Sequence, residues 1–132
     1  MRVLICGSRE WTDADLIRRE LSALQGVEVV VEGEAPGADT LARQAAEQLG
    51  IPVLPFSADW DRHGRAAGPL RNQRMLDEGK PDLVLAFTDG LNTSRGTANM
   101  VSRGRFAGLP VRVISHPGAG SVTRDVTAHP DS

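Results

Sequence analysis

The sequence has a single cysteine and a single lysine, and the shortage of cysteine excludes two kinds of structure. The single cysteine, Cys6, allows neither an internal disulfide nor a cysteine metal cluster, and its place at the end of an apolar stretch predicts a buried thiol. No apolar run is long enough to span a membrane, and the first residues lack the pattern of a signal peptide. We therefore expect a cytoplasmic, reducing setting without membrane attachment.

The sequence also lacks a large excess of either charge, because it has 15 basic and 17 acidic residues and a formal net charge of -2. This balance provides no overall field to attract nucleic acid, and an aromatic content of 4% offers no stripe for stacking single-stranded bases. Lys80 is the only lysine, so the basic residues are nearly all arginines. Arginine suits bidentate contacts with phosphate, although a bias in codon usage explains the same composition.

What the sequence does contain is a regular alternation of short apolar stretches and amphipathic segments over residues 1–115. The apolar stretches predict five strands, at residues 2–6, 27–31, 53–56, 83–87 and 111–114. The amphipathic segments predict helices at residues 12–25, 38–49, 70–79 and 98–107. Thr12 and Asp15 have the form of a capping box for the first helix. Residues 57–69 show no periodicity and are expected to be a long loop.

Strands that alternate with helices at this spacing predict an α/β fold: a Rossmann-like, doubly wound, mainly parallel sheet of five strands with helices on both faces. Right-handed crossovers favour the order 3-2-1-4-5, in which the strands at residues 2–6 and 83–87 are neighbours at the topological switch point. Residues 116–132 are rich in Pro, Gly, Ser, Thr and Asp and are expected to be a flexible tail after a single domain at 1–115.

Glycine-rich polar loops follow three of the predicted strands, and in this topology all three lie at one rim of the sheet. They are residues 7–9, 33–37 and 88–97. Gly96 and Thr97 precede a predicted helix, whose first N–H groups and positive dipole end bind anions readily. The loop at residues 7–9 lacks the glycine pattern of a dinucleotide fingerprint. The coincidence of the three loops predicts a site for a ligand that carries phosphate.

Several other side chains fit such a site, each with a simpler structural explanation beside it. Arg71 and Asn72 are placed to contact a phosphate and a ribose hydroxyl from the first turn of a helix. Asp39 either stabilises a helix dipole and its loop or contacts a ribose hydroxyl. Trp60 either stacks on a base or pins its loop onto the sheet. Arg9 is either an anion clamp or a solvated turn residue.

His63 lies beside Asp59 and Asp61, but no second histidine is near in the sequence, so we expect a solvated loop there. No metal site and no cofactor are predicted.

Taken together, the loops resemble the SLOG superfamily, the Rossmann-like group that includes the Lonely-guy phosphoribohydrolases and the DNA-processing protein DprA. Within it, the chain is most similar to the YspA/YpsA-related branch. The segments that carry the resemblance are residues 7–9, 32–39, 58–60, 67–75 and 96–97. The resemblance implies a pocket for a nucleotide or a nucleotide-derived ligand. It implies that Arg71, Asn72, Gly96 and Thr97 line the phosphate and ribose, with Ser8 and Arg9 close by.

The sequence departs from the phosphoribohydrolases at one important position. Their glycine-rich motif is followed by a catalytic Glu, and the corresponding residue here is Met100. Hydrolysis of an N-glycosidic bond is therefore not implied, although Asp89 and Glu34 are candidate substitutes as the catalytic carboxylate. Glu34 also belongs to an acidic loop where the family usually has paired glycines, which puts negative charge beside the pocket.

We therefore predict a protein that binds a nucleotide or a nucleotide-derived molecule, such as one related to ADP-ribose, as a sensor or a processing protein. One alternative is a nucleoside-phosphate hydrolase or transferase, and another is a single-strand nucleic-acid binder, against which the composition argues. The sequence does not define the oligomeric state; exposed faces of the helices at 70–79 and 98–107 could pair in a homodimer or a higher homo-oligomer. The predicted ligand-binding residues are Gly7, Ser8, Arg9, Gly33, Gly37, Asp39, Trp60, Arg71, Asn72, Asp89, Arg95, Gly96 and Thr97.

Overall fold

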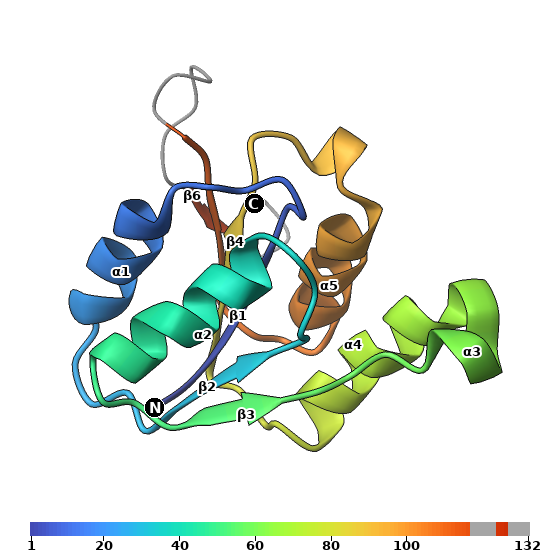
Figure 1. The fold of residues 1–132 in the computed structure, drawn as a ribbon, viewed down its shortest axis with the longest axis horizontal. Coiled ribbons are helices and arrows are strands. Elements are labelled where there is room, and N and C mark those ends of the chain that lie inside the picture. Colours follow the sequence, from blue (N-terminus) through green and yellow to red (C-terminus); the bar gives the residue numbers. More distant parts are fainter. Residues whose placement is uncertain (117–123, 127–132) are drawn as a thin grey trace.

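A computed structural model describes residues 1–116 and 124–126 of the chain and shows a single sheet with helices on both faces (Figure 1). The strands are β1 (Arg2–Gly7), β2 (Val29–Glu32), β3 (Val53–Pro55), β4 (Leu83–Phe87), β5 (Val111–Ile114) and β6 (Arg124–Val126). The longer helices are α1 (Ala14–Ser22), α2 (Ala38–Gln48), α4 (Ala67–Asp77) and α5 (Arg95–Phe106). A short helix, α3 (Trp60–His63), precedes α4.

The strand order is β3-β2-β1-β4-β5-β6, and the first five strands in this order are parallel. The predicted doubly wound α/β fold and its 3-2-1-4-5 order are confirmed. The sheet has one strand more than predicted, because β6 pairs antiparallel with β5. The rest of the predicted tail, 117–123 and 127–132, lies outside the described residues.

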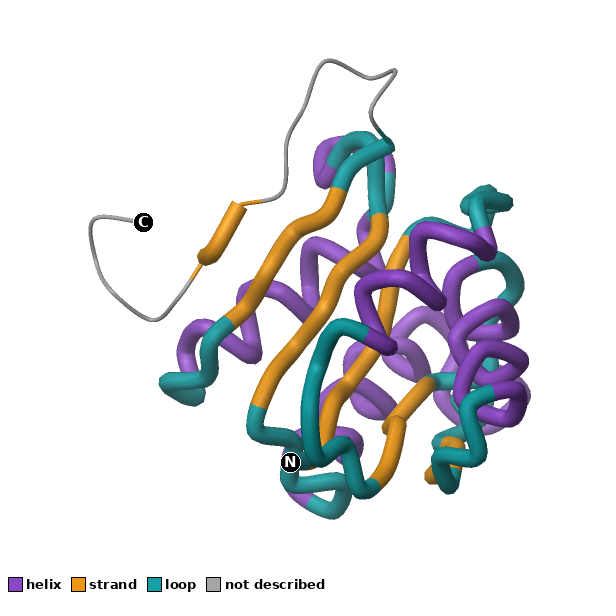
Figure 2. Tube along the Cα trace, turned by 90° about the vertical axis from the view of Figure 1, so that its left-hand side faces the viewer, coloured by secondary structure: helices purple, strands orange, loops and turns teal. Residues whose placement is uncertain are grey.

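The two faces of the sheet bury separate apolar clusters, because successive side chains of a strand point to opposite faces. Val3 and Ile5 of β1 pack toward α1 and α2 together with Trp11 and Phe87. Leu4 packs on the other face with residues of α4 and α5. Figure 2 shows the helices lying on both sides of the strands. Every residue of β4 is buried, as expected for a strand in the middle of a parallel sheet.

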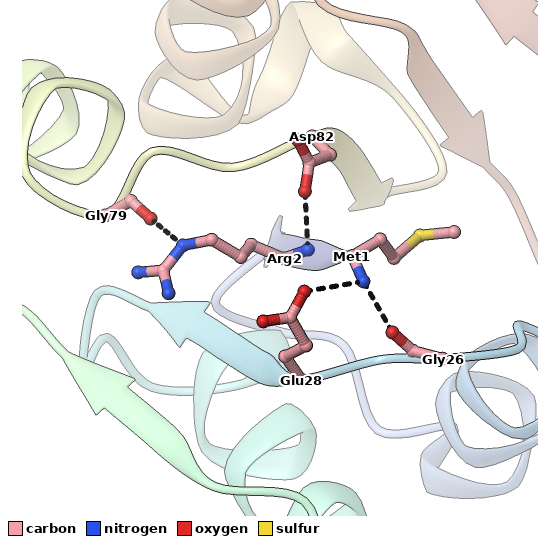
Figure 3. A network of polar contacts seen from close by, with 6 residues as sticks. All are labelled: Met1, Arg2, Gly26, Glu28, Gly79 and Asp82. Carbon is pink, nitrogen blue, oxygen red and sulfur yellow. Dashed lines mark hydrogen bonds and ion pairs between the residues drawn. The ribbon is translucent and has the colours of Figure 1, made fainter.

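The amino ends of the strands are held by a polar network around the first two residues (Figure 3). The Met1 ammonium donates to the Gly26 carbonyl and to Glu28, while the Arg2 backbone N–H donates to Asp82 at 2.7 Å. The Arg2 side chain donates to the Gly79 carbonyl at 2.7 Å. These hydrogen bonds tie the amino ends of β1, β2 and β4 together, and a cavity of about 350 Å³ lies beside them, lined by residues that include Met1, Leu24 and Val111.

Three local predictions are wrong. The cap of α1 is Asp13 and not Thr12, because the Asp13 carboxylate accepts from the Leu16 N–H at 3.0 Å. The expected loop at 57–69 contains α3, a 3-10 turn and the start of α4. The predicted loop at 88–97 likewise contains the first turn of α5, which begins at Arg95.

No helix of the described residues is long and apolar enough to cross a membrane.

Candidate functional site

A cleft opens at the carboxyl ends of β1 and β2, between these strand ends and the first turns of α4 and α5. Its volume is about 940 Å³, within the usual range for small-molecule sites. We call it the rim cleft; most of its predicted lining residues are present, namely Gly7, Ser8, Arg9, Gly33, Glu34, Asp39, Trp60, Arg71, Asn72, Arg95, Gly96 and Thr97. The cleft lies at the topological switch point, where the fold places its ligands.

Two glycines let the chain come close enough to form the wall of the rim cleft. A Cβ atom at Gly7 would lie 2.3 Å from the Phe87 carbonyl oxygen, so no larger residue fits between β1 and β4. Gly37 has φ +79°, and a Cβ atom there would lie 2.4 Å from the backbone oxygens of Ser8 and Arg9. Gly37 itself does not line the cleft, so its part is to join the loops after β1 and β2.

The loop after β2 is held by two buried carboxylates. Asp39 Oδ2 accepts from the backbone N–H groups of Gly33 at 3.1 Å and Ala35 at 3.2 Å. Glu32 Oε1 accepts from the N–H of Glu34 at 2.6 Å. Three consecutive N–H groups are therefore occupied by the protein's own acids, and this loop has none of them left for a phosphate. The acidic residues here fold the loop in the manner of anions bound to backbone amides.

Burial raises the pKa of both of these acids. It raises the pKa of Asp39 to about 6, against the hydrogen bond from Ala35 and the nearby Arg71, which lower it. Burial likewise raises the pKa of Glu32 to about 7, although the bond from Glu34 lowers it. Only 4% of Asp39 is exposed, yet it lines the rim cleft, and none of the described residues donates to its Oδ1. Glu32 Oε2 is buried without a partner among the described residues.

Arg71 and Asn72 join the loop after β2 to the start of α5. The Arg71 guanidinium donates through Nη1 to the Gly33 carbonyl and through Nε to Asn72 Oδ1 at 3.0 Å. Asn72 Nδ2 donates to the Gly96 carbonyl at 3.2 Å and to Asn99 Oδ1 at 3.1 Å. Most donors of this pair are therefore used internally. None of the described residues accepts from Arg71 Nη2, which leaves this group for the cleft.

The first turn of α5 carries free backbone donors at the rim cleft. None of the described residues accepts a hydrogen bond from the N–H groups of Arg95, Gly96 or Thr97. The residue before the helix, Ser94, makes no side-chain cap and donates instead to Thr97 Oγ1 at 2.6 Å. The first turn also lacks an acidic residue that would neutralise the helix dipole. This turn can therefore accept an anion.

The two carboxylates proposed as catalytic from the sequence are placed differently. Asp89 does not line the rim cleft, and its Oδ1 accepts from the backbone N–H of His116 at 2.6 Å. Asp89 is therefore wrongly placed for both of its predicted roles. Glu34 lines the cleft, but its Oε1 accepts from the Ser57 hydroxyl.

Sequence reasoning missed several cleft residues, among them Arg65 and Asn99. Arg65 lies in the segment read as an irregular loop, so its position over the cleft had no periodic signal. Asn99 follows Gly96 by three residues and so shares its face of α5, a spacing that identifies it once the helix start is known. Among the described residues, no three His, Cys, Asp or Glu side chains cluster as a metal site would require.

The fold and the rim cleft define a Rossmann-like, doubly wound α/β protein with a cleft at the carboxyl ends of its strands. A model of the YspA, cpYpsA-related SLOG family matches residues 1–63. The chain is 42% identical over 119 residues to the Gene 61 protein of Mycobacterium phage D29, covering 83% of this chain and 93% of that protein. The chain belongs to the YspA, cpYpsA-related SLOG family.

A solved structure gives the same fold. The X-ray structure of DNA processing protein A (DprA) from Streptococcus pneumoniae superposes with a TM-score of 0.70 at 20% identity and covers 85% of this chain. The matched region is 49% of the DprA chain, so this protein spans about half of that length. At this identity the likeness establishes the fold.

Proposed function

We propose that this protein binds a nucleotide or a nucleotide-derived small molecule in the rim cleft, with an anionic group of the ligand at the start of α5. The observation that carries the proposal is the set of free N–H groups at Arg95, Gly96 and Thr97, which line a cleft of suitable volume. Membership of the SLOG family supports a nucleotide-related role.

The charges around the rim cleft support the same ligand. Arg71 is only 9% exposed and keeps Nη2 for the cleft, while Arg9, Arg65 and Arg95 also line it. Three acids, Glu10, Glu34 and Asp39, line the same cleft. Asp39 and Glu34 already accept hydrogen bonds from the protein's own donors, so the guanidinium groups can still contact an anionic group of a ligand. Asp39 Oδ1 supplies a hydrogen-bond acceptor in the same cleft, which suits a sugar hydroxyl.

Isothermal titration with AMP, ADP-ribose, NAD and a short oligonucleotide tests this proposal. We expect micromolar binding of at least one nucleotide, and a loss of about tenfold or more, roughly 1.5–3 kcal/mol, in Arg71→Ala. Arg95→Ala removes a second cleft arginine whose side chain is exposed, so folding is not at risk. Arg74→Ala is the matched control, because Arg74 lies on the same helix but outside the cleft, over Phe56.

The proposal fails if no nucleotide binds, or if Arg74→Ala weakens binding as much as the two cleft variants do. Tight, salt-dependent binding of the oligonucleotide alone would favour a single-strand nucleic-acid binder instead.

A second function, cleavage of the N-glycosidic bond of a nucleoside phosphate, is favoured by one observation at Asp39. A buried carboxyl that lines the rim cleft with Oδ1 unpartnered and a pKa of about 6 is suited to accept a proton near neutral pH. Water would lose a proton to Asp39 as its oxygen bonds to the sugar carbon and the bond from that carbon to the base nitrogen breaks. The released base takes up a proton from solvent at nitrogen, and Asp39 returns its proton to solvent.

Chromatographic detection of free base released from AMP tests this second function. Asp39→Asn keeps an oxygen for the N–H groups of Gly33 and Ala35 but removes the proton acceptor. We expect release to fall by about 100-fold or more in this variant. In the parent protein the rate should rise as the pH increases through about 6, because only ionised Asp39 takes up a proton. Release that is absent in the parent, or unchanged in the variant, contradicts the assignment.

A further inference from the structure

Trp60 lines the mouth of the rim cleft, yet 54% of its side chain is exposed. The other tryptophan of the chain, Trp11, is only 6% exposed and packs against Phe87. An exposed indole gives up the stabilisation that its burial would bring. Its presence at the cleft mouth therefore calls for a role other than core packing.

The segment that carries Trp60 contributes no side chain to the core. We call residues 57–66 the arm; every residue from 59 to 66 is exposed, and α3 contains no buried residue. Figure 1 shows α3 at the edge of the molecule, beside α4 and away from the sheet. At its start, the Ser57 hydroxyl donates to Glu34, and within the arm the Arg62 N–H donates to Asp59 Oδ1 at 3.2 Å. Trp60 therefore does not pin the arm onto the sheet, which was one of the two readings of its sequence.

One edge of the indole nevertheless packs against α4 at Gly68. A Cβ atom at Gly68 would lie 3.3 Å from Trp60 Cη2 and 4.0 Å from Cζ3. Gly68 is buried in the first turn of α4, where alanine would favour the helix more. The glycine thus makes room for the ring edge beside the cleft, and the ring is positioned without being buried.

The rest of the rim cleft has a complementary chemistry. Its lining is otherwise polar, charged or aliphatic, and Trp60 is the only aromatic residue among the described residues that line it. A ligand with an anionic group at the start of α5 and a planar ring at the cleft mouth would meet a matching surface at both ends. Stacking on an exposed indole requires only a π face on the ligand and tolerates different bases.

We propose that Trp60 and Gly68 form an aromatic subsite at the mouth of the rim cleft, where the indole stacks on a planar heteroaromatic ring of the ligand. This proposal rests on the proposed function, since it concerns the other end of the same ligand. It assigns affinity for the ring to the arm and affinity for the phosphate to α5.

Titration calorimetry with AMP and with ribose 5-phosphate separates the two ends, because the second compound lacks the ring. We expect Trp60→Ala to weaken AMP binding by about tenfold or more and to leave ribose 5-phosphate binding unchanged. Trp60→Phe keeps an aromatic face and should retain most of the affinity for AMP. Phe106→Ala is the control, because Phe106 is 96% exposed, lies at the far end of α5 and does not line the cleft.

The outcomes distinguish failure of this proposal from failure of the proposed function. If AMP and ribose 5-phosphate bind equally well, or Trp60→Ala weakens both alike, the aromatic subsite is overturned while the anion site stands. If neither compound binds, both proposals fail.

Tryptophan fluorescence provides an independent measurement. In Trp11→Phe, Trp60 is the only indole, and its exposure makes it accessible to acrylamide. AMP should reduce the quenching of this fluorescence at least twofold, and ribose 5-phosphate should not. Quenching that AMP leaves unchanged overturns the stacking.

Discussion

At the scale of single residues, Glu32 and Asp39 hold the loop beside the rim cleft through backbone N–H groups. Acidic side chains in a cleft normally repel an anionic ligand or bind a metal ion. Here the two carboxylates accept hydrogen bonds from backbone N–H groups of the loop after β2, as a bound anion would. The cost is that both are buried, and burial raises the pKa of each. The fold therefore holds two carboxyls that resist ionisation near the cleft.

A stability measurement tests this burial at Glu32. Its pKa of about 7 in the folded chain is above the value of about 4.3 expected when unfolded, so its contribution to stability falls as pH rises from about 4 to 7. Glu32→Gln abolishes that loss. The stability of the variant relative to the parent should therefore rise by about 2 kcal/mol from pH 5 to pH 8, measured by urea unfolding. Glu47→Gln, at an exposed position of α2, is the control. A relative stability that is the same at both pH values contradicts the account.

Gly33 and Arg71 form a second residue-scale test. A Cβ atom at position 33 would lie 2.7 Å from Arg71 Nη1, so Gly33→Ala displaces the guanidinium. Because the displaced guanidinium loses its buried hydrogen bonds to the Gly33 carbonyl and Asn72, stability should fall by about 1–3 kcal/mol, while affinity for AMP falls about tenfold. Calorimetry and thermal unfolding on the same variant check both parts. Unchanged affinity would show that the position of Arg71 is unimportant for the ligand.

At the scale of elements, the same substitution at the start of α5 should have opposite effects on the stability of the protein and on its affinity for the ligand. An acidic residue in the first turn of a helix stabilises it by about 0.3–1 kcal/mol, but it would occupy the same dipole that a ligand anion needs. Arg95→Glu should therefore raise the melting temperature slightly while weakening AMP binding at least tenfold. Thermal unfolding measures the expected rise in melting temperature, and calorimetry measures the expected fall in affinity for AMP. If stability and affinity move in the same direction, the helix start does not hold the anion.

The elements that could be predicted are those with a strong pattern of their own. β4 has the predicted bounds, because an uninterrupted apolar run between Pro81 and the polar loop leaves little choice. α3 was not predicted, because none of its side chains is buried and its sequence therefore has no amphipathic pattern. The helix predicted at residues 70–79 begins earlier, at Ala67, so that Pro69 lies in its first turn. Proline is tolerated there because the first turn needs no N–H donor.

The site was predictable in outline because topology brings separate loops to one rim. The loops after β1 and β2 and the residues before α5 do meet at the rim cleft. What the sequence could not provide is the direction of each side chain. Asp89 follows β4 but turns to the His116 backbone, and Asp39 uses one oxygen for its loop and leaves the other toward the cleft.

At the scale of the whole molecule, the sheet divides its two ends between stability and binding. The contacts of Met1 and Arg2 tie the amino ends together, and the carboxyl ends open into the rim cleft, which is larger than the cavity beside Met1. A homodimer and a cytoplasmic setting stay predictions; size-exclusion chromatography with light scattering tests the first.

The most direct test of the central claim is an amide NMR titration of the protein with AMP. The account predicts that the largest shifts fall on the N–H groups of Arg95, Gly96 and Thr97, because these donors gain an anionic acceptor. The N–H groups of Gly33 and Ala35 should shift less, since Asp39 already occupies them. Shifts centred at the amino ends of the strands, or none at the start of α5, would contradict the account.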